Sequence, residues 1–337
     1  MTIYELAKEL NMTPAMVSRA FNPEAKINEE KRKLVLETAE KYNFSPNKFA
    51  SRLSMQKIKI GIFINSKFSI SCDKMLLGIK YAHELLKDYK IEYDITVFRS
   101  GEKDIADYEA VIRKYAELDG MIVAGLSSEK YSAMLNNAYE TNKNIVQVQG
   151  INVNTEYLFA SKHNEETASC LAAEFLYNSL KYSENKNVIL FTGDTESTVH
   201  RVSRQCFVNA CERFGLNILE CVDMKDSDEN LRKIVPVVFG KYDIDGIYIT
   251  SGVSTALCEY MEERGIDIPF VAFDTHNKVK EYLEKGIISA TISQNVVAQM
   301  KNAFELLVKY IIDGGKREKN IYTDVQLVLK SNINQFE

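Results

Sequence analysis

The sequence predicts a small all-α headpiece followed by a larger α/β core, and three observations support this fold class. The first 57 residues contain helix start and stop signals and no alternating strand pattern. Beyond Lys57, short apolar runs alternate with helical stretches of about 10–15 residues, which is typical of βαβ units and a parallel sheet. This alternation occurs twice along the chain. We therefore expect a core of two doubly wound parallel-sheet subdomains.

Residues 2–22 are predicted to form two short helices joined by a tight turn. In the first helix, apolar residues recur at i, i+3, i+4 and i+7, which places them on one face. They are Ile3, Leu6, Ala7 and Leu10. Thr2 and Glu5 have the T-x-x-E spacing of a capping box. The helix is expected to end at Asn11, because asparagine tolerates left-handed backbone better than other non-glycine residues.

The second helix is expected to begin after Thr13, an N-cap residue followed by Pro14 in the first helical position. Its predicted inward-facing residues are Val17, Ala20 and Phe21. Its predicted outward-facing residues are Pro14, Ala15, Ser18, Arg19 and Asn22. An ordinary helix pair could show the same caps. A helix-turn-helix with small, hydroxyl and basic groups on its exposed second helix would also suit a DNA-reading unit.

A third helix and a hinge complete this part of the chain. Asn28, Glu29 and Glu30 open the third helix, in which Val35, Ala39 and Tyr42 are expected to face inward. Ser45-Pro46 opens a short fourth helical segment before the composition changes. We therefore expect a helix-turn-helix headpiece over residues 1–44 and a hinge helix with a linker over residues 45–57.

The core is predicted from its strands, which are short apolar runs bounded by turn signals. In the first half they are expected at 57–64, 92–98, 120–125, 144–149 and 157–161. In the second half they are expected at 187–193, 217–222, 246–250, 269–273 and 288–293. A long helix at 295–313 and a last strand at 321–329 follow. The expected subdomains are 58–161 with about 294–320, and 162–293 with about 321–337.

The headpiece and hinge resemble those of the lac repressor (LacI/GalR) family of bacterial transcription regulators. The matching residues are Thr2, Leu6-Ala7, Thr13, Val17-Ser18-Arg19, Asn22, and Phe44-x-Pro46-Asn47 with Ala50 and Leu53. The resemblance spans essentially the whole chain, since that family has a periplasmic-binding-protein-like core. It implies a sequence-specific regulator, most often a repressor, that acts as a homodimer on a pseudo-palindromic operator in double-stranded DNA. A small-molecule effector, expected to be a sugar or sugar derivative, would control operator binding.

The resemblance also assigns DNA contacts to individual positions. Phosphate contacts are expected from Thr2, Thr13, Ser18, Asn22 and Asn28. Arg19 can hydrogen-bond guanine in a bidentate manner, a contact worth about 1–3 kcal/mol of base discrimination. Pro14 and Ala15 stand at positions that most often set specificity in the family. Because neither side chain can hydrogen-bond, we expect apolar contact with a thymine methyl group.

The hinge residues are expected in the minor groove. Leu53 could be a helix-core leucine, since it lies four residues after Phe49. In the family, the corresponding leucine is wedged into a central pyrimidine–purine step and bends the duplex. Asn47 and Ala50 would lie in the same groove. Such a wedge needs two hinges side by side, which is a further reason to expect a homodimer, and the absence of a leucine heptad tail argues against a tetramer.

Effector candidates follow from the rule that ligands bind beyond the carboxyl ends of parallel strands. They are Asn65, Phe68, Gln149, Arg201, Arg204, Ser251, Asp274 and Gln294. Polar residues after strands also cap helices, so position alone does not separate the two roles. The resemblance points to Asp274 in VAFDT as the residue that binds effector hydroxyls, and to Gln294 and Gln149. The family's usual arginine falls at Ser203, so Arg201 or Arg204 is expected to replace it.

Charge is distributed unevenly along the chain. Residues 1–57 contain ten Lys and Arg against seven Asp and Glu, whereas the remaining residues contain 32 against 40. The headpiece therefore carries +3 and the rest of the chain −8, which confines attraction for phosphate to one end. No apolar run approaches the roughly 18 residues of a membrane span and no signal peptide is visible, so a cytoplasmic protein without a membrane partner is expected.

Several other classes are disfavoured. The six cysteines lack C-x-x-C spacing and the four histidines are dispersed, which predicts no disulfide framework, no metal site and no cofactor. No nucleophile elbow, phosphate loop or histidine–carboxylate cluster is present, so an α/β enzyme is not expected. The alternatives kept open are a corepressor-type regulator that responds to a purine or a partner protein, and a sugar-binding sensor that does not regulate DNA.

Overall fold

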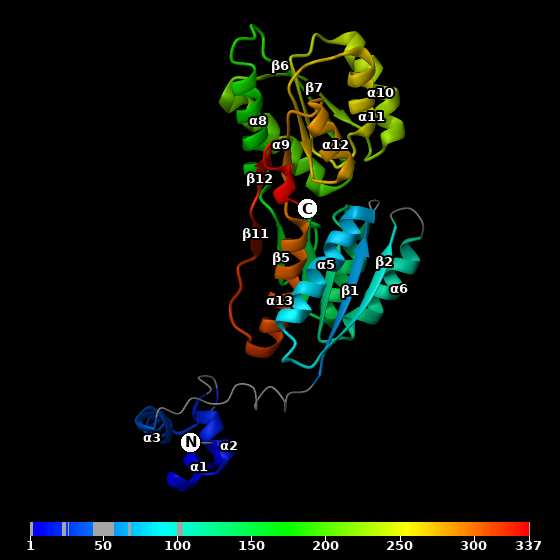
Figure 1. Cartoon of the computed structure of the whole chain (residues 1–337). Coiled ribbons are helices and arrows are strands. Elements are labelled where there is room, and N and C mark those ends of the chain that lie inside the picture. The colour runs from blue at the N-terminus through cyan, green and yellow to red at the C-terminus, as the bar shows by residue number, and fades with distance from the viewer. Residues whose placement is uncertain are drawn as a thin grey trace. The chain divides into compact units, whose positions relative to one another are not determined.

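The computed structural model describes residues 3–21, 25, 27–42, 57–66, 69–99 and 104–336. The chain divides into two compact units (Figure 1). The headpiece unit comprises residues 1–57 together with residues 87–90, and the core unit comprises residues 58–86 and 91–337.

The headpiece contains the three expected helices, α1 (Ile3–Glu9), α2 (Pro14–Ala20) and α3 (Glu29–Lys41). They bury a common apolar cluster of Leu6, Ala7, Val17, Ala20, Val35 and Ala39. The left-handed backbone predicted at Asn11 is confirmed by its φ of 53°. The N-cap predicted at Thr13 is also confirmed, since its side chain accepts a hydrogen bond of 3.3 Å from the Met16 amide.

One headpiece prediction is wrong. Tyr42 does not face inward: it follows the last turn of α3, is 40% exposed, and donates its hydroxyl to Glu9 Oε1 at 3.3 Å. The helix ends at Lys41, so the spacing that would have carried Tyr42 onto the inner face stops one residue short. Five predicted DNA-contact residues lie outside the described residues: Thr2, Asn22, Asn47, Ala50 and Leu53. Thr2 is also the first residue of the predicted capping box.

The core contains two six-stranded sheets flanked by helices (Figure 1). The first sheet has the order β11-β5-β4-β3-β1-β2 and all of its pairs are parallel. Its strands are β1 (Ile58–Asn65), β2 (Ile91–Phe98), β3 (Gly120–Ala124), β4 (Ile145–Val148), β5 (Phe159–His163) and β11 (Asn320–Thr323). The helices of this first subdomain are α5 (Ser69–Leu85), α6 (Ile105–Ala116), η1 (Glu129–Tyr131), α7 (Ser132–Thr141) and α13 (Val296–Asp313).

The second sheet has the order β12-β10-β9-β8-β6-β7 and is parallel except for the β10–β12 pair. Its strands are β6 (Asn187–Thr192), β7 (Asn217–Asp223), β8 (Gly246–Ile249), β9 (Phe270–Phe273), β10 (Ala290–Ser293) and β12 (Gln326–Val328). The helices of this second subdomain are α8 (Glu165–Ser179), α9 (Thr198–Phe214), α10 (Asp228–Lys241), α11 (Thr255–Arg264), α12 (Asn277–Lys285) and η2 (Ile333–Gln335).

The single strand predicted at 321–329 is two strands. β11 pairs with β5 in the first sheet, and β12 pairs with β10 in the second, so the chain changes subdomain between them. The Thr323 hydroxyl lies 3.2 Å from the Gln294 carbonyl and 3.4 Å from the Lys162 carbonyl, which belong to the other two crossings. The three crossings between subdomains are therefore held side by side, and the apolar pattern of 321–329 does not reveal the break between them.

Candidate functional site

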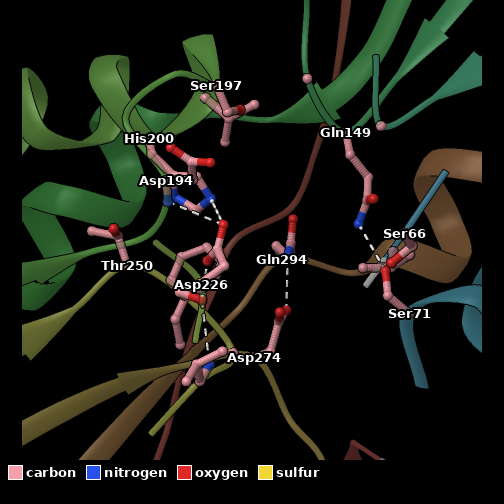
Figure 2. Close-up of a pocket in the computed structure, with 18 of the residues that line it drawn as sticks. Ser66, Ser71, Gln149, Asp194, Ser197, His200, Asp226, Thr250, Asp274 and Gln294 are labelled. Carbon is pink, nitrogen blue, oxygen red and sulfur yellow. Dashed lines mark hydrogen bonds and ion pairs between the residues drawn. The ribbon is translucent and has the colours of Figure 1, made fainter. Parts of the chain in front are cut away.

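A cavity of about 590 Å³ lies between the two subdomains of the core, at the carboxyl ends of their strands. From the first subdomain it is lined by residues that follow β1, β3 and β4, and by the start of α5. From the second it is lined by residues that follow β6, β7, β8, β9 and β10. Figure 2 shows hydroxyl, amide, carboxylate and imidazole groups gathered around it.

Five of the eight predicted effector residues line this cavity. They are Asn65, Gln149, Ser251, Asp274 and Gln294. Asp274 and Gln149 both have left-handed backbone, with φ of 68° and 69°, directly after buried strands. Asp274 Oδ1 accepts a hydrogen bond of 2.8 Å from Gln294 Nε2, which joins the ends of β9 and β10 (Figure 2).

Both polar atoms of the Asn65 side chain form hydrogen bonds within the protein. Its Nδ2 donates to the Gly125 carbonyl at 3.1 Å, and its Oδ1 accepts from the Tyr108 hydroxyl at 3.1 Å. Since both ends of the amide are engaged, Asn65 shapes the cavity wall by tying β1 to β3 and α6.

Neither Arg201 nor Arg204, which were expected to replace the family arginine, is among the residues that line the cavity. Arg201 Nη1 donates to the carbonyls of Thr195 and Glu196, each at 3.0 Å. Arg204 is exposed. The inner face of α9 instead presents positions 200 and 203, and residues one place along a helix turn away by about 100°. Phe68 lies outside the described residues.

Sequence reasoning missed a histidine–aspartate pair on this wall. His200 Nε2 lies 3.2 Å from Asp226 Oδ2, and the pair lines the cavity (Figure 2). Ser251 Oγ donates to Asp226 Oδ1 at 2.6 Å, and the Asp194 amide donates to Oδ2 at 3.1 Å. Gly193 makes room for the pair, since a Cβ there would lie 2.3 Å from Asp226 Oδ1 and 2.4 Å from His200 Cε1.

The ionised form of Asp226 is strongly favoured. Burial acts to raise the pKa of its carboxyl group, but the hydrogen bond and charge of His200 and the hydrogen bonds from Ser251 and Asp194 together hold that pKa well below its usual range. The side chain is only 12% exposed, so these contacts are weakly screened by solvent. His163, which also lines the cavity, has its pKa lowered by burial and is therefore neutral near pH 7.

We predict that Asp226→Asn lowers the free energy of unfolding of the core by about 1.5–3 kcal/mol at neutral pH, the usual contribution of hydrogen bonds to a charged group. Because the folded-state pKa is depressed, the wild-type advantage is fully present above the unfolded-state pKa of about 3.9 and is lost progressively as pH falls from there through the folded-state pKa. The difference between the urea midpoints of the two proteins should therefore be constant from about pH 7 to about pH 5 and should narrow towards about pH 3. Asp267→Asn, at an exposed position, is the control, and parallel curves for Asp226→Asn and the wild type would contradict the assignment.

Polar contacts join the two subdomains at two places in the cavity lining. At the first, the Ser127 and Ser197 hydroxyls share a hydrogen bond of 2.7 Å, and Thr198 Oγ1 donates to the Ser127 carbonyl at 2.9 Å. At the second, Lys74 Nζ donates to the carbonyl and hydroxyl of Thr275, at 2.5 Å and 3.1 Å. The core is thus in a closed arrangement with polar contacts across its cleft.

The headpiece presents most of its described DNA candidates to solvent. Thr13, Ala15, Ser18, Arg19 and Asn28 are exposed and Pro14 is half-buried. Asn28 is the N-cap of α3, where its Oδ1 accepts from the amides of Glu30 and Lys31. The second helix of the pair therefore offers Ala15, Ser18 and Arg19 on one accessible surface.

The described residues form no group of three or more histidine, cysteine or acidic side chains placed to hold a metal ion. The helices in this part of the chain include none with both the length and the apolar composition needed to cross a bilayer.

Comparisons with known proteins agree with this architecture. A model of the periplasmic binding protein domain family matches residues 77–316. The chain is similar to the HTH-type transcriptional regulator pepR1 of Lactobacillus delbrueckii subsp. lactis, with 24% identity over 98% of this chain and 97% of that protein. It is similar in fold to a putative LacI transcriptional regulator from Bacteroides fragilis, with a TM-score of 0.71 and 18% identity over 84% of this chain and 100% of that chain.

A second solved structure shares the fold of the core. GanP, a glucose-galactose binding protein from Geobacillus stearothermophilus, has a TM-score of 0.72 and 18% identity, covering 82% of this chain and 99% of that chain. The family model covers more than half of the chain, and the similarity to a helix-turn-helix regulator extends over nearly all of it. The chain therefore belongs to the periplasmic-binding-protein domain family, and the relative that matches nearly its whole length supports its resemblance to the LacI/GalR type of transcription regulator.

Proposed function

We propose that this protein is a cytoplasmic, sequence-specific DNA-binding repressor whose operator binding is controlled by a small polyhydroxylated effector, a sugar or sugar derivative. The observation that supports this most directly is the combination, in one chain, of a helix-turn-helix with an exposed second helix and a two-subdomain core closed around a polar cavity. No catalytic step is proposed.

On the DNA side, the proposed roles follow the exposed surface of α2. Arg19 reads a guanine through paired hydrogen bonds, Ser18 contacts phosphate, and Ala15 with Pro14 meets a thymine methyl group. Thr13 and Asn28 stand at helix N-termini, where backbone amides also favour phosphate. The remaining contacts are proposed for Thr2, Asn22, Asn47, Ala50 and Leu53.

On the effector side, hydroxyl, amide and carboxylate groups project from both walls of the cavity, which is how proteins bind ligands rich in hydroxyl groups. We propose that Asp274 accepts hydrogen bonds from ligand hydroxyls, with Gln294, Gln149 and Ser251 beside it. The glucose and galactose bound by GanP, which shares this fold, support the choice of a sugar. His200 is added to the proposed ligand contacts, whereas Arg201 and Arg204 are removed from them.

A homodimer is proposed from an apolar surface on the first subdomain. Leu77, Tyr81 and Leu85 follow one another at i, i+4 and i+8 along α5 and are exposed; this set is called the outer row below. Tyr93 and Val97 are exposed on β2, the edge strand of the same sheet. An apolar helix row beside an open sheet edge is a surface that a second copy of the chain can cover in a symmetric contact.

The proposal predicts a defined operator. Selection from a randomised DNA pool should yield a palindrome with a central pyrimidine–purine step, bound by two chains as judged by the mass of the complex. Ala15→Gln should change the preferred base at one symmetric pair of positions, because glutamine can hydrogen-bond adenine where alanine offers only apolar contact. An unchanged base preference at every position would contradict the role of Ala15, and recovery of only salt-sensitive, sequence-independent binding would contradict the regulator itself.

Effector control is tested on the selected site. D-Glucose, D-galactose and D-arabinose should be titrated against the protein–operator complex. Hypoxanthine and guanine should be titrated in the same way, to test the purine alternative. A change in operator affinity with one of the sugars supports the proposal. A response to a purine alone would favour the corepressor type of regulator.

A further inference from the structure

Lys74 occupies a position that the proposed function does not explain. It projects from α5 of the first subdomain into the cavity and reaches Thr275 of the second subdomain. An ammonium group has three N–H bonds, and among the described residues the structure records two acceptors for it, both on Thr275. A third N–H is thus available at the cavity wall.

The environment of this ammonium group is unusual for a lysine. Burial lowers the pKa of Lys74, and the nearby charge of Asp274 offsets only part of that effect. Both recorded acceptors are neutral oxygens, and Asp274 itself is hydrogen-bonded to Gln294. A half-buried cation between a neutral acceptor pair and a carboxylate is well placed to donate to a ligand oxygen that also donates to Asp274.

Lys74 also stands at the head of the outer row. Residues 74, 77, 81 and 85 are spaced i, i+3, i+7 and i+11, which places them along one face of α5. The helix is packed tightly at Gly78, where a Cβ would lie 2.5 Å from the Val297 carbonyl of α13. The helix and its outer row are therefore fixed on the first subdomain, and Lys74 stands at the end of that helix which lines the cavity.

We propose that Lys74 is the residue that links effector binding to closure of the core: it bridges the subdomains through Thr275 and offers its remaining N–H to the ligand. This inference rests on the proposed effector control of operator binding, but its structural part can be tested without any ligand.

The first test is amide hydrogen exchange on the full-length protein. Lys74→Met keeps the length of the side chain and removes its charge and donors. We expect exchange to rise at least about tenfold in the segments around Ser127 and Ser197, which lie across the cleft from each other, because closure loses a charge-assisted contact. Strands β1 and β9 should exchange as in the wild type, which shows that the fold is intact.

Two further variants serve as comparisons for Lys74→Met: one should have a smaller effect, and the other is a control. Thr275→Val removes one acceptor and keeps the carbonyl, so it should have a smaller effect in the same segments. Lys143→Met, an exposed lysine paired with Glu140, is the control and should change nothing across the cleft. Wild-type exchange around Ser127 and Ser197 in the Lys74→Met protein would overturn the proposal.

The second test uses the operator and the three sugars named above. In Lys74→Met, the sugar concentration needed for half of the change in operator affinity should rise about 10- to 100-fold. An undiminished response would overturn the ligand contact. The wild type could give no sugar response while Lys74→Met still raises exchange across the cleft. That result would contradict the proposed sugar control but support the Lys74–Thr275 contact as the link between the subdomains.

Discussion

Leu6→Ala is expected to unfold the headpiece and leave the core intact. Leu6 is fully buried in the cluster formed by α1, α2 and α3, whose other buried members are small or β-branched. Removing a buried leucine side chain costs about 2–5 kcal/mol. A domain of this size has only about 3–9 kcal/mol of stability in total. The substitution therefore removes most of the free energy of unfolding of the headpiece.

The functional consequence is a loss of specific DNA binding. Affinity for the selected operator should fall at least about tenfold, because only the folded fraction of headpieces can bind. Sugar binding and the urea midpoint of the core should be unchanged. Leu36→Ala, at a leucine of α3 that is 42% exposed, is the matched control and should bind the operator normally. Equal operator affinity for both variants would show that the three-helix cluster is not needed for recognition.

The headpiece could be predicted so closely because its signals are local. Asn11, Thr13 and Pro14 act on backbone within three residues of themselves, and the turn and the cap they predict are both present. Tyr42 was misplaced because the spacing of apolar residues does not reveal where a helix ends. The break between β11 and β12 was missed for a related reason: it depends on Thr323 meeting two other crossings far away in the sequence.

The sequence allowed several cavity-lining residues to be predicted, but not the contacts that those residues make with one another. Asp274 and Gln294 follow buried strands, and the strand-end rule places both at the cavity. Asp226 also follows a strand by a few residues, so the same rule applied to the loop after β7 would have found it. His200 and Lys74 lie on helices, and their contacts with Asp226 and Thr275 join residues 26 and 201 positions apart. Such pairs are created by tertiary packing, and one sequence gives no sign of them.

Gly125 is the position where a single methyl group should do the greatest damage to the core. Its φ is 79°, and a Cβ built on it would lie 1.8 Å from the Asn65 carbonyl oxygen. No side-chain rotation relieves an overlap with backbone, so β1 and β3 must separate where they meet the cavity. Gly125→Ala should therefore cost about 2–5 kcal/mol, from left-handed strain and overpacking together.

The measurement is the urea midpoint of the core, followed by sugar titration of the surviving folded protein. Besides lower stability, Gly125→Ala should show weaker sugar binding, because moving Gly125 breaks the Asn65 Nδ2 hydrogen bond to its carbonyl and shifts the cavity wall. Gly240→Ala is the matched control: it lies in α10 with open space around a Cβ, and alanine there should be neutral or stabilising by up to about 1 kcal/mol. A Gly125→Ala protein as stable as this control would mean that the ends of β1 and β3 are not held as closely as the structure places them.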